Sequence, residues 1–396
     1  MTKGRITFLW TVLLCPMLLL WTACGGGSGN ASGGGGSNAL SSSASWMTGN
    51  WQITMERGIG DPKPTTQSGF LVANKNAISG SLLIGDATCS GVGSASGTIT
   101  GTSIAMVVSG VGQTITLNGA LGSDKASMGG DYATLASGCG TSETGTWIAS
   151  LVQPLGGNLG GNFTSNSTAI VAPVAGQVSQ AQNAVGTSAS VTGNFSATGS
   201  SCISTANISG LLTGTSLVMN LLDANGNQIG QVAAALDLPS LNGTASAQGT
   251  YRILPLTRNP KPPQPPCVAG ELGTVCLVTG ATGVTCTTTS LSGPGSSVKQ
   301  GDDVTFSVTV TSIGPNLPTG SVTFRDGNAT LGAGPVALGT VVSNCATPPA
   351  QTSGTASLCT NSLTAGPHLI TAVYGGDGNF AASTSNVVGQ VVNGLQ

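Results

Sequence analysis

The chain has 396 residues, of which only 6% are charged and 4% are aromatic. A globular protein usually has about 25% charged residues, so this surface must consist mainly of serine, threonine, asparagine and glycine. The formal net charge of −2 and the lack of a basic cluster exclude a nucleic-acid partner, because phosphate contacts need lysine and arginine. A hydrophobic content of 39%, arranged in periodic runs, argues against general disorder.

Residues 1–23 are predicted to be an export signal. A basic start is followed by an apolar run from Phe8 to Trp21, which is too short and too interrupted for a membrane-spanning helix. The run ends in the sequence Leu20-Trp21-Thr22-Ala23-Cys24. This resembles a bacterial lipoprotein lipobox, with Trp21 where the family usually has leucine.

The lipobox resemblance implies that Cys24 is lipidated and becomes the mature N-terminus, which places the protein at the outer membrane or cell surface. Ordinary cleavage near Ala31, giving a secreted or periplasmic protein, is the alternative. Residues 24–45 are almost entirely glycine, serine, asparagine and alanine, so we expect a flexible tether with a reach of about 25 Å.

A cysteine-anchored pattern occurs twice after the tether. Cys89 and Cys202 are each followed twelve residues later by Gly-Thr-Ser. The pattern Cys-x-x-x-Glu-x-Gly-Thr also occurs twice, with its acids at Glu143 and Glu271. We therefore predict a duplicated module over 46–155 and 156–280, in which Gly161-Asn162-Phe163 echoes Gly49-Asn50-Trp51 near the start.

The first copy reads as about eight short strands separated by glycine, asparagine and serine turns, and the second copy follows the same pattern, so the predicted class is all-β. Such a meander either closes into a small barrel, similar to the calycin type, or folds over as a sandwich. We favour the barrel. The proline-rich stretch 259–266 interrupts the second copy and is interpreted as an exposed loop, with an interdomain linker as the alternative.

Ten cysteines are present, of which Cys15 lies in the leader and Cys24 is the lipidation candidate. The remaining eight in an exported chain indicate disulfides. A metal site is the rival interpretation, but the spacings contain no Cys-x-x-Cys and the chain has a single histidine. The repeat pairs Cys89 with Cys139 and Cys202 with Cys267, and proximity pairs Cys276 with Cys286 and Cys345 with Cys359.

Apolar and polar residues alternate strongly in the last hundred residues, as in Val304, Phe306 and Val308. The stretches Gly320 to Gly327, Leu363 to Tyr374 and Gly376 to Phe380 resemble a bacterial Ig-like repeat of the group 3 kind. The resemblance covers residues 285–393. It implies a seven-strand β-sandwich that acts as a spacer or adhesive module in bacterial surface proteins. The insertion that carries Cys345 and Cys359 departs from the family pattern.

Several residues could carry chemistry, and each has a simpler structural interpretation. His368 could be a general base or a metal ligand, but the resemblance places it at a strand start. Four acids could contribute to a calcium site, yet ordinary turns are the preferred interpretation. They are Asp302, Asp303, Asp326 and Asp377. Glu143 and Glu271 could serve as paired carboxylates, but they lie in different modules, and a turn or cap role is expected.

The leading hypothesis is a non-enzymatic cell-surface lipoprotein with a structural, adhesive or binding role. We expect no catalytic residue, cofactor or metal, and the expected partners are the membrane, through its lipid anchor, and a surface glycan or protein. The alternative is a carrier that holds a small apolar ligand inside the duplicated modules. That alternative requires a closed barrel with an apolar cavity of about 300 Å³ or more.

Overall fold

The computed structural model describes most of the chain after the tether. The described residues are 47–57, 64–85, 90–123, 125–136, 142–200, 202–237, 245–255, 267, 269–280, 284–312, 316–327, 329–343 and 354–394. Strands are the only long elements among them, which confirms the all-β prediction. Within these ranges, no helix is long and apolar enough to cross a membrane.

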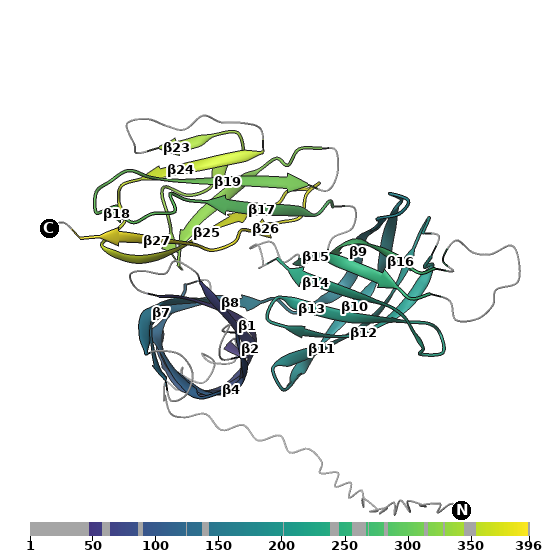
Figure 1. The fold of residues 1–396 in the computed structure, drawn as a ribbon, viewed down its shortest axis with the longest axis horizontal. Coiled ribbons are helices and arrows are strands. Elements are labelled where there is room, and N and C mark those ends of the chain that lie inside the picture. The colour runs from purple at the N-terminus through teal and green to yellow at the C-terminus, as the bar shows by residue number, and fades with distance from the viewer. Residues whose placement is uncertain are drawn as a thin grey trace, which may run out of the picture. The chain divides into compact units, whose positions relative to one another are not determined.

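The first eight strands form a closed barrel, here called barrel 1 (Figure 1). They are β1 (Gly49–Arg57), β2 (Thr65–Asn74), β3 (Ala77–Gly85), β4 (Gly91–Thr100), β5 (Ser103–Gly110), β6 (Gln113–Leu121), β7 (Ser127–Ala136) and β8 (Glu143–Val152). Each strand pairs antiparallel with the next, and β8 returns to pair with β1. The barrel prediction is therefore confirmed, and the sandwich alternative for this module is wrong.

Local sequence explains the strands of this barrel. In β5, Ile104, Met106 and Val108 are buried, while the residues between them are exposed, which is the period of two that a strand with one buried face requires. The tight turn before β5 uses Gly101 at a φ of +62°, and Gly214 takes the equivalent place in the second copy at +54°. The repeated Gly-Thr-Ser therefore marks a turn that needs a left-handed residue.

The next eight strands form a second closed barrel, barrel 2. They are β9 (Gly156–Ser165), β10 (Val171–Val185), β11 (Ser188–Ala197), β12 (Thr205–Thr213), β13 (Ser216–Leu222), β14 (Gln228–Leu236), β15 (Ala245–Ile253) and β16 (Glu271–Thr279). The proline-rich stretch 259–266 lies outside the described residues, but it connects β15 and β16, which pair directly. The interdomain-linker alternative is therefore wrong.

Strand register shows which residues of the two barrels are equivalent. Gly97 faces Met106 in barrel 1, and Gly210 faces Met219 in barrel 2. Trp51 and Leu159 likewise face equivalent glycines on the neighbouring strand. Trp51 is thus equivalent to Leu159 and not to Phe163, so the predicted echo between the two Gly-Asn pairs is displaced by four residues along the strand. A short dipeptide can recur at several positions along a strand, whereas the pairing with the neighbouring strand identifies one equivalent residue.

The C-terminal domain consists of two sheets that share a core. One sheet contains β17 (Thr287–Ser292), β19 (Val304–Ser312), β24 (Thr355–Thr360) and β23 (Val341–Ser343). The other contains β18 (Val298–Lys299), β27 (Val388–Asn393), β25 (Gly366–Tyr374), β20 (Ser321–Asp326) and β21 (Ala329–Thr330), with β22 (Val336–Ala337) and β26 (Ser383–Thr384) beside it.

Phe306 from the first sheet and Phe324 and Tyr374 from the second are fully buried between the two sheets. The expected sandwich is therefore present. It contains more strands than the seven implied by the family resemblance, because several strands have only two or three residues.

Candidate functional site

Two of the four predicted disulfides are present between described cysteines. Cys202 is bonded to Cys267 within barrel 2, and Cys276 on β16 is bonded to Cys286 just before β17. Cys359 is also disulfide-bonded. Four of the predicted cysteines lie outside the described residues, namely Cys24, Cys89, Cys139 and Cys345.

The two repeated glutamates occupy matching places at the start of the last strand of each barrel. Tyr132 donates a hydrogen bond to Glu143 over 3.2 Å, and Tyr251 donates one to Glu271. Burial and the adjoining carboxylate raise the pKa of both tyrosines above the usual range. Arg57 also forms an ion pair with Glu143. Each acid therefore accepts a hydrogen bond from a tyrosine on the neighbouring strand. This role is structural, but it differs from the turn or cap role that we expected.

The tyrosine rings explain the Glu-x-Gly spacing of the repeat. Tyr132 faces Gly145 and Tyr251 faces Gly273 across the strand pair. A Cβ added at Gly273 would lie 2.4 Å from the tyrosine ring, and one at Gly145 would lie 2.7 Å from its ring. Only glycine leaves room for the ring to cover the neighbouring strand, so the motif encodes packing.

One group of three potential metal ligands occurs among the described residues, and it consists of Cys202, Cys267 and Glu271. A metal ion requires cysteine thiolates, and these two sulfurs are bonded to each other. In this oxidised form the group fits a structural bridge at the end of barrel 2 and does not fit a metal centre.

His368 is placed near the start of β25 and is buried. Its Nδ1 lies 2.6 Å from Asp326 and its Nε2 lies 2.8 Å from the Thr364 carbonyl. Burial by itself lowers the pKa of His368, but the two hydrogen bonds and the Asp326 charge together raise it above the usual value. Through its hydrogen bond to Asp326, this histidine is a structural link between β25 and β20.

Two of the candidate calcium acids serve turns instead. Asp302 accepts a hydrogen bond from the Lys299 amide over 2.9 Å. Asp377 accepts the amides of Asn379 and Phe380 over 2.8 and 3.0 Å. Asp326 is engaged by His368, and Asp303 makes no grouping with the others in the described part of the chain. The geometry favours the turn interpretation of these acids.

Glu56 is a buried acid that the sequence analysis did not single out. It is 0% exposed, and a Cβ added at Gly389 would lie 1.7 Å from its carboxylate. Burial raises its pKa to about 7; the His368 charge opposes this shift and the Asp326 charge adds to it. Nothing in the strand sequence around Glu56 distinguishes it from an exposed acid, because its burial depends on residues more than three hundred positions away.

Among the described residues, the side chains inside the two barrels argue against the carrier hypothesis. Trp51 and Trp147 are both 0% exposed inside barrel 1, and the Trp51 indole donates to the Met47 carbonyl over 2.8 Å. Barrel 2 contains an apolar cavity of only about 10 Å³, bordered by Leu159 and Met219 among others. That volume holds about one water molecule, far below the 300 Å³ or more that a ligand carrier requires.

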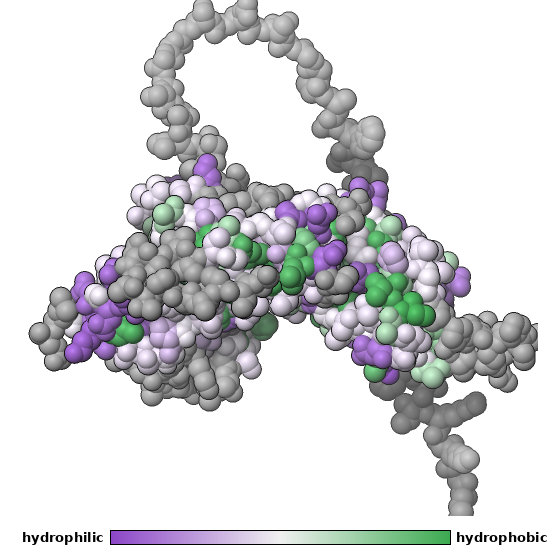
Figure 2. All heavy atoms as spheres, turned by 90° about the horizontal axis from the view of Figure 1, so that it is seen from above, coloured by the Kyte–Doolittle hydropathy of each residue, from purple (hydrophilic) through white to green (hydrophobic). Residues whose placement is uncertain are grey.

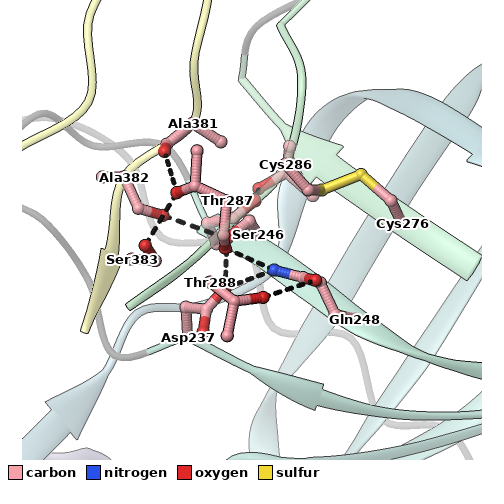
Figure 3. Close-up of a disulfide and its surroundings, with 12 residues drawn as sticks. Asp237, Ser246, Gln248, Cys276, Cys286, Thr287, Thr288, Ala381, Ala382 and Ser383 are labelled. Carbon is pink, nitrogen blue, oxygen red and sulfur yellow. Dashed lines mark hydrogen bonds between the residues drawn. A yellow bond between two sulfur atoms is a disulfide. The ribbon is translucent and has the colours of Figure 1, made fainter. Parts of the chain in front are cut away.

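The Cys276–Cys286 bridge lies where barrel 2 meets the C-terminal domain (Figure 3). Beside it, Gln248 on β15 donates to the Thr287 carbonyl and accepts from the Thr288 hydroxyl over 3.1 Å. The Thr287 hydroxyl lies 2.7 Å from that of Ser383, and both residues are 0% exposed. A covalent bond and the two hydrogen bonds of Gln248 therefore reinforce the short connection between the two folds.

The junction between barrel 2 and the C-terminal domain also contains the acid Asp237 (Figure 3). The Ser246 hydroxyl lies 2.7 Å from the Asp237 carboxylate and 3.2 Å from the Ala382 carbonyl. Burial raises the pKa of Asp237 to about 6, although the hydrogen bonds from Ser246 and Gln248 oppose this shift. The acid contributes to the junction through these hydrogen bonds.

The outer face of barrel 2 is the most distinctive open surface. No charged side chain occurs between Glu143 and Asp223, so β9 to β13 present only neutral residues. Figure 2 shows that residues of intermediate hydropathy make up much of the described surface in that view. On β10 to β13 this face has a hollow of about 330 Å³. Its lining residues are Ala175, Asn194, Phe195, Ser196, Thr205, Ala206, Asn207, Leu222 and Ala224.

Comparison with known proteins identifies one part of the chain. Residues 291–393 match the family model of the bacterial Ig-like domain (group 3). No curated protein and no solved structure matches the chain. The two barrels thus remain without a named family. The match agrees with the two-sheet core around Phe306 and Phe324. The C-terminal domain of this chain is therefore a bacterial Ig-like domain of group 3.

Proposed function

We propose that the protein is a non-enzymatic surface lipoprotein, anchored through Cys24, whose folded domains form a scaffold for binding or adhesion. The observation that carries this proposal is that both barrels are closed around filled cores. Where the described side chains fill the interior of a barrel, a ligand is recognised by the exterior. The Ig-like domain and the β modules fit a structural or binding role.

The junction beside Cys276 and Cys286 supports the scaffold role. A binding surface recognises its partner with less loss of entropy when its parts are held in place before contact. The disulfide and the Gln248 hydrogen bonds restrain the Ig-like domain against barrel 2. Disulfides persist in an oxidising compartment, which agrees with export.

Cys24→Ser tests the anchor. In a bacterial host that exports and lipidates proteins, the wild-type chain should incorporate a labelled fatty acid and sediment with membranes. The variant should lose the label and appear in the soluble fraction. Retention of both the label and the membrane association by the variant would refute lipidation at this residue.

Attachment of whole cells tests the surface role. On intact cells, the anchored wild-type chain should be cleaved by an added protease. Cells that produce it should attach to glycan-coated or protein-coated surfaces more strongly than cells that produce Cys24→Ser. Equal attachment of the two strains to every coated surface would refute adhesion. Protection of the wild-type chain from the protease on intact cells would refute the cell-surface location.

A further inference from the structure

Two asparagines line the hollow on barrel 2. Asn194 on β11 and Asn207 on β12 face each other directly across the strand pair, and both are exposed. Facing positions bring side chains within about 5.5 Å of each other at Cβ. Neither amide hydrogen-bonds to another described residue. Together they offer four N–H donors and two carbonyl acceptors to a ligand.

A second row of polar groups lies beside the asparagines. Ser196 faces Thr205 on the same two strands. The Ser196 hydroxyl donates to the Ala175 carbonyl over 3.2 Å, which leaves its oxygen available as an acceptor. The Thr205 hydroxyl has no partner among the described residues, so it can donate or accept. The hollow is thus lined by donors and acceptors in two adjacent rows.

One side of the hollow is apolar. Leu222 on β13 faces Asn207, and Ala224 follows in the turn to β14. The acid between them, Asp223, accepts hydrogen bonds from the Asn225 and Asn227 amides over 2.9 and 2.8 Å and from the Asn227 side chain over 2.9 Å. Its carboxylate is therefore committed to the turn, and Leu222 and Ala224 line the hollow beside Asn207 with methyl and methylene groups.

The absence of charge narrows the class of ligand. Recognition of phosphate, sulfate or carboxylate groups normally uses arginine or lysine, and none occurs between Glu143 and Asp223. A ligand for this hollow must supply hydroxyl donors and acceptors together with an apolar face, and it must be neutral. A sugar ring has these properties, since its hydroxyls project around a face of C–H groups.

We propose that the hollow binds an uncharged saccharide through Asn194 and Asn207, with Leu222 and Ala224 against the sugar ring. This inference rests on the proposed binding function and adds the chemical class of the partner. A volume of about 330 Å³ lies at the lower end of ligand pockets, so the hollow takes a short part of a longer neutral glycan.

Barrel 1 supplies an internal control for this assignment. Ser81 and Ser94 face each other at the places equivalent to Asn194 and Asn207. In the next row, barrel 1 has Leu83 and Val92, which are 42% and 58% exposed. Barrel 1 therefore lacks both the amides and the polar second row, and the saccharide site belongs to barrel 2 alone.

The test uses the full exported chain with its disulfides intact and a set of neutral hexasaccharides of glucose, mannose and N-acetylglucosamine. Binding is measured by isothermal titration and by ligand-observed NMR, with polygalacturonate as the charged comparison. We expect at least one neutral hexasaccharide to bind and polygalacturonate not to bind. Asn194→Ala/Asn207→Ala should weaken binding at least tenfold, whereas Ser81→Ala/Ser94→Ala should leave it unchanged.

Thr205→Trp provides a second variant, because a large side chain would fill the hollow without removing either amide. Matching far-UV circular dichroism and thermal midpoints establish that all the variants are folded. Failure of every neutral hexasaccharide to bind overturns the proposal. So does binding that survives both the double asparagine variant and Thr205→Trp.

Cell attachment separates this inference from the proposed function. If cells displaying Asn194→Ala/Asn207→Ala still attach as well as wild-type cells, the surface role stands and the saccharide site is refuted. If the purified wild-type chain binds a hexasaccharide but wild-type cells attach to no coated surface, the site stands and adhesion fails. If cells displaying Asn194→Ala/Asn207→Ala lose attachment to glycan-coated surfaces but keep attachment to protein-coated surfaces, the result supports both the saccharide site and the surface role.

Discussion

The disulfide within barrel 2 and the disulfide that joins barrel 2 to the C-terminal domain should differ in their contribution to stability, because they close loops of very different length. Cys202 and Cys267 are 65 residues apart, while Cys276 and Cys286 are 10 residues apart. In the chain-entropy model, a bridge stabilises the folded state by restricting the unfolded chain, and a longer loop is restricted more. The perturbation is replacement of each pair by alanine, in separate double variants.

The chain-entropy model gives the expected loss of stability for each double variant. Applied to a separation of 65 residues, it predicts that Cys202→Ala/Cys267→Ala lowers the free energy of unfolding by about 4.3 kcal/mol. Applied to a separation of 10, it predicts about 2.7 kcal/mol for Cys276→Ala/Cys286→Ala. The long-loop variant should thus be less stable by about 1.6 kcal/mol.

Tryptophan positions make the assay specific. Trp51 and Trp147 are buried in barrel 1, and no tryptophan occurs after Trp147. During urea unfolding, tryptophan fluorescence therefore reports barrel 1, while far-UV circular dichroism reports all three folds. Each double variant should shift the circular-dichroism transition and leave the fluorescence midpoint near the wild-type value.

The reverse order of stability would refute the loop-entropy reasoning. If Cys276→Ala/Cys286→Ala were the less stable variant, the short bridge would stabilise the native junction itself, beyond its effect on the unfolded chain. Wild-type protein treated with a reductant is the matched control, because it opens the bridges without changing any side-chain volume by substitution.

Three further predictions concern barrel 2. Phe163→Ala should lower the free energy of unfolding by about 3–5 kcal/mol, because the Phe163 ring packs 5.3 Å from Phe195 and 4.7 Å from the Tyr251 ring, between centroids. An unchanged urea midpoint would show that this cluster is not essential. Gly273→Ala should lower the free energy of unfolding by about 1–3 kcal/mol, because its new Cβ would lie 2.2 Å from the Thr164 carbonyl oxygen. Gly156→Ala is the control, since a Cβ at that position meets nothing within 4 Å. Its stability, measured by thermal melting, should stay within about 0.5 kcal/mol of wild type. Burial raises the pKa of Asp237 from 3.8 to about 6, so its contribution to stability is fully present below pH 4 and is lost as the pH rises through about 6. Asp237→Asn should remove this loss of stability, which amounts to about 2–3 kcal/mol. If the free energy of unfolding of the variant changed with pH between 4 and 6 as steeply as that of the wild type, Asp237 would not be the group responsible.

The candidate sites were predictable only in part. The cysteine spacings placed Cys202 with Cys267 and Cys276 with Cys286, because a repeat and short separations limit the pairings. The repeated Glu143 and Glu271 were recognisable as special, but not their tyrosine partners, because cross-strand register lies outside what spacing encodes.

The sequence by itself determined the local structure of this protein and the identity of its last domain. Alternation such as that of Val304, Phe306 and Val308 has the period of a strand, and this period depends only on the backbone. The Gly-Thr-Ser turns and the Ig-like motifs are likewise local, so the all-β class, the duplication and the C-terminal family could all be inferred before the structure.

Only the tertiary structure decided how the strands close and which surfaces remain open. Pairing of β1 with β8 joins segments about a hundred residues apart, and no local pattern specifies whether such an edge closes into a barrel or stays open as a sandwich. The burial of Glu56 is of the same kind, because it depends on Gly389 of a distant strand. The facing of Asn194 with Asn207 depends instead on the register between two neighbouring strands, which the spacing of the residues does not specify.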